Sequence, residues 1–513
     1  MKDKIITKEA AALLIKDGST VCTVGMTLVG AAESILSSIE KRFLQTGQPK
    51  GLTLLHAAGQ SDRERGIQHL AYPGLVKRII GSHWGLSPKW MEMIANNKVE
   101  AYCFPQGQMV HLYSAMAAGL PGRMSSVGLG TFIDPRLEGG RMNECTSDNL
   151  IELLEIKNNE YLFYPGIPLD FLVIRGTTAD RKGNLTTDEE AMKLEILPAV
   201  LAAKRYGAKV IVQIKYLAED GSLDPKSIVV PGEFIDAIVL CDAPEHDHRQ
   251  TSSSYYHPSY CGKLREFSEV SSTKTPLNIR KLIGRRAVKF IKDGDIINLG
   301  TGIPNDVIGQ IVREEKLESN VTITVESGIY GGLQAGGVDF GIGKNLSAMI
   351  SHQDQMLYYN GAGVDITYMG AGELDINANV NATKLGTQCT GAGGFIDITQ
   401  NARHVVFCST FTAKGLVVKI ENNKLEIVQE GKVKKLVNNV NQISYNGRLA
   451  LKQNQKMHFV TERAVFELTP EGLELIEIAP GIDLKKDILE HMEFSPIVSK
   501  NLKIMDIELF KEL

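Results

Sequence analysis

From the start of the chain, stretches with the apolar spacing of a helix alternate with stretches that have the apolar pattern of a strand. The apolar positions from Ile5 to Ile15 recur every three or four residues and stop at Asp17-Gly18, which predicts a helix with a glycine end. Residues 21–24 are β-branched or small and predict a buried strand, and residues 25–30 predict a loop into the next helix. Repetition of this order favours an α/β fold with mainly parallel sheets.

Further along, the pattern predicts strands, one long helix and two hairpins. The predicted strands are residues 172–175, 210–216, 235–241 and 321–325, and the helix is Glu189 to Tyr206. Residues 416–428 and 464–478 each place two strands around a polar turn, which predicts hairpins at the edge of the fold.

The chain contains an internal repeat. IKDGSTVCTVG (residues 15–25) matches IKDGDIINLG (291–300), LTLLHAAG (52–59) matches VTITVESG (321–328), and GLGTFID (128–134) matches GAGGFID (391–397). Three matches in the same order predict two homologous open α/β domains, since a solenoid has a far shorter period. We predict an N-terminal domain over residues 1–242, a linker over 243–275 that is rich in Ser, His, Tyr and Pro, and a C-terminal domain over 276–513.

Composition is typical of a globular protein of several domains. The 513 residues are 43% hydrophobic and 23% charged, and the formal net charge is -4. A nucleic-acid-binding protein normally carries a basic excess, so we expect no nucleic-acid partner. No apolar run approaches about 18 residues, so we expect no membrane span and no signal peptide. Seven scattered cysteines without a CxxC spacing favour a reducing, cytoplasmic location.

Glu326 is the strongest candidate for chemistry. It ends the predicted buried strand 321–325, and Ser327-Gly328 break the strand after it. Burying a carboxylate is costly unless it has partners or a task, and strand ends are where open α/β sheets place their sites. The alternatives are a carboxylate that caps the next helix or one that is paired with a Lys or Arg. The repeat favours chemistry, because the first half has Ala57 at the matching position.

The glycine loops at 300–302 and 391–394 provide backbone N–H groups that suit a phosphate or an oxyanion. Gly331-Gly332 predict a close backbone approach. Neither half contains GxGxxG with an acidic residue about 20 positions later, and GxxxxGK[ST] and GxSxG are absent. These absences disfavour a dinucleotide enzyme, a P-loop enzyme and an α/β-hydrolase. The pair His246 and His248 has no clear third metal ligand nearby, and solvated side chains are the simpler interpretation, so we expect no metal site.

Several motifs together resemble the family I coenzyme A transferases, in the form in which two homologous subunits are fused. The resemblance runs nearly end to end and is closest to acetate and propionate CoA-transferases. The succinyl-CoA:3-ketoacid enzymes are more distant and carry SENG where this chain has VESG. The matching motifs are GTFIDPRLEGGRMN (130–143), TTADRKGNL (177–185), NLGTGIP (298–304), ESGIYGG (326–332), GAGGFIDI (391–398) and TERAVFEL with GLELIEIAPGIDL (461–484).

The resemblance implies the fold shared by CoA transferases and deaminase/isomerase-like proteins, and a transferase of sulfur-containing groups with Glu326 as its nucleophile. The carboxylate would attack a short-chain acyl-CoA thioester and pass through a covalent glutamyl-CoA thioester, in ping-pong order. Amides near Gly393 and Gly394 would form one side of an oxyanion hole. The loop from Gly25 to Gly30 would form the other side, although the family commonly has GGFxxxG and this chain has VGMTLVG.

The resemblance also predicts which residues meet the substrates. The coenzyme A site would be lined by Gly300, Gly302, Gly391, Ala392 and Phe395. A substrate carboxylate would be oriented by Gln106, in the turn 104–107, and by Gln388. Coenzyme A would be a substrate and covalent intermediate rather than a permanent cofactor. The partners would be an acyl-CoA, a short-chain carboxylate and further copies of this chain in a homodimer or homotetramer. An acyl-CoA hydrolase and a non-catalytic CoA or sugar-phosphate sensor remain as alternatives.

Overall fold

The computed structural model describes residues 4–266 and 276–512. By packing, the chain divides into two compact units. The first contains residues 1–266, 326–360 and 386–397, and the second contains 267–325, 361–385 and 398–513. The units therefore differ from a simple division into halves, because two segments of the predicted C-terminal domain pack with the N-terminal unit. The domain boundaries stay a prediction, and residues 267–275 of the predicted linker lie outside the described residues.

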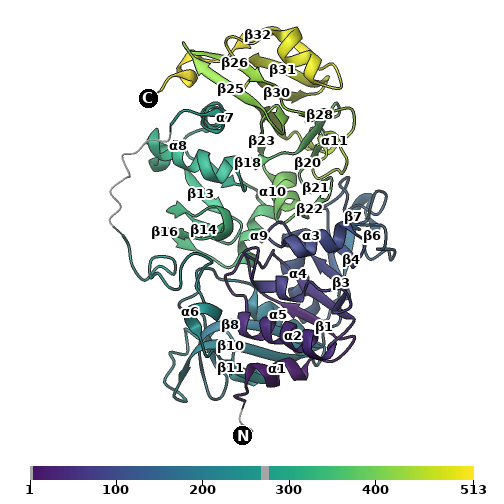
Figure 1. Ribbon diagram of the computed structural model, residues 1–513, viewed down its shortest axis with the longest axis vertical. Helices are drawn as coiled ribbons and strands as arrows, with labels where there is room; N and C mark the ends of the chain where they lie inside the picture. Colours follow the sequence, from purple (N-terminus) through teal and green to yellow (C-terminus); the bar gives the residue numbers. More distant parts are fainter. Residues whose placement is uncertain (1–3, 267–275, 513) are drawn as a thin grey trace. The chain divides into compact units, whose positions relative to one another are not determined.

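A mainly parallel sheet forms the centre of the first unit (Figure 1). The pairs along its path are parallel. The short strand β9 (Leu185–Thr186) is the exception and pairs antiparallel with β8. Along the path the strands run β11 (Ala237–Leu240), β10 (Lys209–Ala218), β8 (Phe171–Asp180), β1 (Thr20–Thr23), β2 (Leu52–His56), β3 (Val76–Gly81) and β4 (Glu100–Cys103).

Helices cover this sheet. Helices α4 and α5 pack against one another, and α5 also lies on β8 and β10. The helices of this unit are α1 (Lys8–Leu14), α2 (Glu33–Thr46), α3 (Pro88–Ala95), α4 (Gln106–Ala117), α5 (Ile196–Arg205), α6 (Pro244–Asp247) and α9 (His352–Asn360). Its smaller strands are β5 (Gly122–Ser125), β6 (Glu152–Ile156), β7 (Asn159–Pro165), β14 (Ile329–Tyr330), β15 (Leu333–Gln334), β16 (Gly343–Lys344), β17 (Ala348–Met349) and β22 (Gln388–Cys389).

The second unit contains a corresponding parallel core that continues into antiparallel strands. Within this unit the order is β13 (Thr322–Val325), β12 (Ile296–Leu299), β18 (Ile366–Gly370), β23 (His404–Cys408), β29 (Lys456–Val460), β30 (Ala464–Thr469), β31 (Gly472–Ile478) and β32 (Ile497–Ile504). The predicted hairpins are confirmed as β25 (Val417–Glu421) with β26 (Lys424–Gln429), and β30 with β31.

The remaining elements of the second unit are short. The helices are α7 (Ile279–Val288), α8 (Gly309–Glu314) and α11 (Gly447–Lys452), and the small strands are β19 (Glu373–Asp375), β20 (Val380–Asn381), β21 (Lys384–Leu385), β24 (Thr412–Ala413), β27 (Val433–Lys434) and β28 (Leu436–Val437). Helix α10 (Phe395–Asn401) spans the division between the units.

The internal repeat is visible in strand order. The parallel order β2, β1, β8, β10, β11 in the first unit corresponds to β13, β12, β18, β23, β29 in the second. By the repeated sequences, β1 corresponds to β12 and β2 corresponds to β13. The pair β1–β2 is parallel, and so is the pair β12–β13. The predicted fold of two homologous α/β parts with mainly parallel sheets and peripheral hairpins is therefore confirmed.

Two local predictions were wrong. The helix predicted over Glu189 to Tyr206 begins only at Ile196. Residues before it form turns and bends around an isolated bridge, because Lys193 pairs with Ser351 and its carbonyl accepts from the His352 amide at 2.7 Å. Pairing with a distant segment thus overrides a modest helix propensity. The turn predicted at 104–107 is in fact the start of helix α4, with Pro105 at the N-cap position.

The predicted linker is also partly ordered. Its residues 243–266 belong to the first unit and include helix α6. His248 is buried beside Glu190 and Gln213 rather than solvated, so that interpretation was wrong for this histidine. All seven cysteines are free thiols. Among the described residues, no group of three or more metal-binding side chains comes together, and no helix combines the length and hydropathy needed to cross a bilayer.

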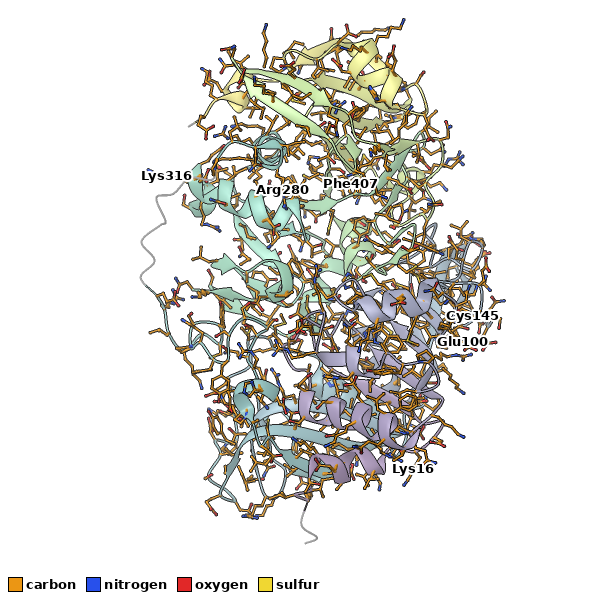
Figure 2. The ribbon with its side chains drawn as sticks, viewed as in Figure 1. Lys16, Glu100, Cys145, Arg280, Lys316 and Phe407 are labelled. Carbon is orange, nitrogen blue, oxygen red and sulfur yellow. The ribbon has the colours of Figure 1, made fainter. Side chains whose placement is uncertain are left out.

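Substitution of Phe407 tests the packing of the second unit. Phe407 lies fully buried on β23, whereas Lys16 lies on the surface after α1 (Figure 2). We expect Phe407→Ala to lower the free energy of unfolding by about 3–5 kcal/mol, because it removes apolar contacts and leaves a cavity. Lys16→Ala should change it by less than about 0.5 kcal/mol. Urea unfolding followed by circular dichroism measures both, and equal effects would contradict the assigned core.

Candidate active site

Glu326 directly follows β13 and is almost completely buried. Its side chain and backbone together are 8% exposed, and Ser327 beside it is fully buried. The Ser327 hydroxyl donates to the Gly341 carbonyl at 2.5 Å. The strand therefore delivers the carboxylate into the interior, and the next residue is tied to a second loop of the same unit.

The glycines after Glu326 are required by close backbone contacts. Gly328 has φ 98°, and a methyl group on it would lie 2.2 Å from the Ile350 carbonyl oxygen. A methyl group on Gly332 would lie 2.2 Å from the Lys344 carbonyl oxygen. The close approach predicted for this stretch is confirmed, and it holds Glu326 in a turn that bulkier residues could not form.

Burial dominates the electrostatics of Glu326. It raises the pKa of the carboxyl to about 7, and the residue's own backbone amide and nearby His352 offset this only in part. In the described part of the chain, no Lys, Arg or His forms a salt bridge with Glu326. The alternative of a structural carboxylate paired with a base therefore has no support there, and a buried unpaired carboxylate is a typical functional group.

His352, which favours the ionised form of Glu326, contacts two further buried side chains. His352 begins α9 and its Nδ1 lies 2.6 Å from the Glu195 carboxylate. Its Nε2 lies 2.8 Å from Nε2 of Gln106, at the start of α4. Sequence analysis identified Gln106 but missed His352 and Glu195, because a single histidine and a glutamate inside a predicted helix carry no local signal.

The backbone of Gln106 is fixed as firmly as its side chain. Its amide donates to the Gly393 carbonyl at 3.0 Å, and the next amide, of Gly107, donates to the Asp397 carboxylate at 2.8 Å. Burial raises the pKa of the Asp397 carboxyl to about 6, although the hydrogen bond from the Gly107 amide favours its charged form. A carboxylate at the first turn of a helix is also favoured by the helix dipole. Two predicted residues, Gln106 and Gly393, are thus held beside one another.

The loop at 391–394 is closely packed against residues 82–84. A methyl group on Gly391 would lie 2.4 Å from the Ser82 carbonyl oxygen. The Gly393 amide donates to that same oxygen at 2.9 Å, and the Ala392 amide donates to the Cys103 sulfur at 3.3 Å. Gly394 is buried, and its amide has no acceptor among the residues that the structure describes. Of the two predicted oxyanion donors, Gly394 is therefore available and Gly393 is engaged.

The loop from Gly25 to Gly30 is a tight turn that is held by backbone hydrogen bonds and by a buried arginine. Met26 and Val29 exchange two backbone hydrogen bonds of 3.0 Å, and Gly30 has φ 76°. The carbonyl of the next residue, Ala31, accepts from buried Arg175 at 3.2 Å.

Two contacts relate this loop to the rest of the first unit. The guanidinium of Arg175 is itself paired with Glu190 at 2.5 Å. A methyl group on Gly341, which accepts from Ser327, would lie 3.2 Å from Cε of Met26. The Met26 side chain of this loop and Ser327, the residue after Glu326, therefore both lie beside Gly341.

The other predicted residues lie on several different elements. Gln388 is exposed on β22, and Phe395 begins helix α10. Gly300 and Gly302 follow β12 in the second unit, where the Gly300 amide donates to the Tyr368 carbonyl at 2.8 Å. Their roles in binding coenzyme A stay predictions.

Comparison with known proteins identifies the family. The model of the coenzyme A transferase family matches residues 4–240 and 282–485, which are most of the chain. The chain belongs to the coenzyme A transferase family. Its activity class is therefore coenzyme A transfer, in agreement with the resemblance carried by the motifs around Glu326.

Full-length relatives support this assignment. The chain is 42% identical to a caffeate CoA-transferase of Acetobacterium woodii, over 99% of this chain and 98% of that one. It is 39% identical to the acetate CoA-transferase YdiF of Escherichia coli K12, over 99% and 95% of the two chains. The crystal structure of the acyl-CoA transferase YdiF apoenzyme from E. coli O157:H7 superposes with a TM-score of 0.94 at 37% identity, covering 100% of this chain and 96% of that one.

The burial of Glu326 predicts a measurable effect on stability. Its pKa in the folded state, about 7, lies above the ordinary value of 4.5, so folding favours the protonated form. The stabilising contribution is complete below pH 4.5 and is lost as pH rises through 7. Glu326→Gln should therefore be more stable than the parent by about 3 kcal/mol at pH 8 and about equal to it at pH 4.5.

Thermal unfolding at the two pH values measures this difference. Glu144→Gln, in an exposed loop, is the matched control and should give the same small change at both pH values. A Glu326→Gln variant that loses stability at pH 8 would contradict the assigned burial of an unpaired charge.

Proposed function

We propose that this protein transfers coenzyme A between a short-chain acyl-CoA and a carboxylic acid, such as acetate, propionate or acetoacetate, with Glu326 as the covalent nucleophile. The observation that carries the proposal is the buried Glu326 carboxylate, which has a raised pKa and no salt bridge among the described residues. Such a group is partly ionised near neutral pH and poorly solvated, which suits a carboxylate nucleophile.

The reaction divides into balanced steps. A Glu326 oxygen attacks the thioester carbonyl, the carbon–sulfur bond breaks, and an acyl-glutamyl anhydride and a CoA thiolate result. The thiolate then attacks the glutamyl carbonyl, which releases the free acid and leaves a glutamyl-CoA thioester. The acceptor acid reverses both steps. One thioester replaces another, so the exchange needs no input of free energy from ATP.

Each step develops negative charge on a carbonyl oxygen, and amide donors aimed there lower the barrier. The Gly394 amide supports this role, because it has no acceptor among the described residues and adjoins Gly393 beside Gln106. The Gly393 amide donates to Ser82 and would have to exchange that partner. The turn from Gly25 to Gly30 is the proposed second source of donors, supported by its contact with Gly341.

Coenzyme A itself would supply binding energy away from the reacting carbon. We propose that Gly300, Gly302, Gly391, Ala392 and Phe395 contact it, and that contacts to its remote parts orient the thioester and exclude water. The relatives act on caffeate and acetate by name, and one related structure is a thioester complex with CoA. Those names support a carboxylate acceptor. A cytoplasmic location and a homodimer or homotetramer stay predictions.

Hydrolysis of acyl-CoA is the second candidate, because water can take the place of the acceptor acid at the same nucleophile. A non-catalytic sensor is disfavoured, since it needs no buried nucleophile and the matched family is named for transfer. The two reactions differ in one measurement: release of CoA in the absence of an acceptor acid supports hydrolysis.

Covalent attachment of coenzyme A tests the mechanism. Incubation with acetyl-CoA alone, followed by digestion and mass spectrometry, should show CoA or its hydroxylamine product on the peptide that contains Glu326. Glu326→Gln should lose the adduct and lower acetate-dependent exchange by at least about 1000-fold, because the nucleophile is absent. Glu144→Gln, which removes a charge from an exposed loop, is the matched control and should keep both the adduct and the exchange. An adduct on any other residue would reject Glu326.

The pH dependence of the first half-reaction tests the raised pKa. The ionised form of Glu326 is the nucleophile, so kcat/KM for acyl-CoA should rise about tenfold per pH unit below 7 and level off above it. Rapid-quench measurement of the glutamyl-CoA adduct and of the released acid between pH 5 and 8.5 gives this profile. A profile that is flat across this range would show that Glu326 is already ionised at pH 5.

A further inference from the structure

Three polar side chains form an uninterrupted buried row in the first unit. Glu195, His352 and Gln106 are 1%, 0% and 2% exposed, and their contacts measure 2.6 Å and 2.8 Å. All three side chains are therefore shielded from bulk solvent. Burial of polar groups at this depth is costly, and each contact must therefore be a properly oriented hydrogen bond.

The direction of these hydrogen bonds follows from the chemistry of the groups. The Glu195 carboxylate oxygen accepts, so Nδ1 of His352 carries the proton that it donates to Glu195. In this tautomer Nε2 of His352 is an acceptor, and it receives a hydrogen from Nε2 of Gln106. Glu195 thus determines, through the imidazole ring, which end of the Gln106 amide faces the histidine.

The opposite end of that amide faces Gly393. The Oε1 atom of Gln106 lies 3.7 Å from the place that a methyl group on Gly393 would occupy, and the His83 ring borders the same space at 3.7 Å. The Gln106 backbone is held there by the Gly393 carbonyl. The row therefore presents a hydrogen-bond acceptor, the Gln106 carbonyl oxygen, on the side of Gly393 that a methyl group would occupy.

We infer that Glu195 and His352 are positioning residues that fix the Gln106 carbonyl oxygen toward Gly393, where it accepts a hydrogen bond from an N–H or O–H group of the acyl-CoA. This inference rests on the proposed function of Glu326. It differs from the expectation that Gln106 orients a substrate carboxylate, because a carboxylate has no hydrogen to give this oxygen. Two groups near a thioester have the required chemistry: the cysteamine amide of coenzyme A and a hydroxyl on the acyl chain.

Substrate analogues distinguish these two sources. The first comparison is acetyl-CoA against an analogue whose cysteamine amide is replaced by an ester, and the second is acetyl-CoA against 2-hydroxyacetyl-CoA. Loss of a single donor to a buried acceptor should lower kcat/KM about tenfold or more. A preference for the amide identifies the coenzyme as the donor, and a preference for the hydroxyl identifies the acyl chain. The absence of both preferences overturns the inference.

Variants test the row itself. Gln106→Met keeps the length of the side chain without the oxygen, and it should remove whichever preference the parent shows. Glu195→Gln removes the fixed acceptor for Nδ1, so it should weaken the same preference and shift His352 toward the Nε2–H tautomer. Long-range ¹H–¹⁵N spectra of histidine-labelled protein report the tautomer, with His352→Asn used to assign the signal.

Glu189→Gln is the matched control. Glu189 lies in the same segment and pairs with Lys215 at 2.8 Å, away from the row, so its loss should leave both the preference and the tautomer unchanged. Unaltered preference and tautomer in Glu195→Gln would refute the inference, even if the Glu326 adduct forms normally. Absence of that adduct in the parent protein would instead refute the proposed function, so the two failures are distinct.

Discussion

The arrangement of the residues around Glu326 depends on the free-energy cost of burying its carboxylate. Glu326 leaves the end of β13 and enters an interior in which the described residues offer it no ion pair. Water would stabilise its charge far better than this environment does, and the raised pKa measures the difference. A fold tolerates such a cost where the group has chemical work to do, because a desolvated carboxylate is a stronger nucleophile than a hydrated one.

The surrounding groups limit that cost without removing it. His352 favours the ionised form of Glu326, but the ring is already engaged by Glu195 and Gln106. Burial therefore still dominates, and the pKa of Glu326 stays at about 7. The same buried row then serves both the charge of the nucleophile and the orientation of Gln106.

Sequence reasoning recovers the parts of this arrangement that depend on local pattern. The strand ending at Glu326, the glycine approaches at 328–332 and the internal repeat are all encoded in short stretches, and the structure has each of them. The parts that depend on distant contacts are lost. Residues 189–195 have helical composition, yet they form turns and bends, because Lys193 pairs with Ser351. That pairing brings Glu195 to His352, and nothing near either residue indicates it.

The repeat shows why the proposed nucleophile occurs in only one half. Ala57 stands where the second half has Glu326, and the strand before it, β2, ends at His56. Trp84 donates to His56 at 3.1 Å, and burial lowers the pKa of that histidine to about 4, so it is neutral and part of the core. A carboxylate at Ala57 would have to be buried against this packing, again without water. After duplication, one copy of the site can therefore become scaffold, and its residues 82–84 now support the glycine loop at 391–394.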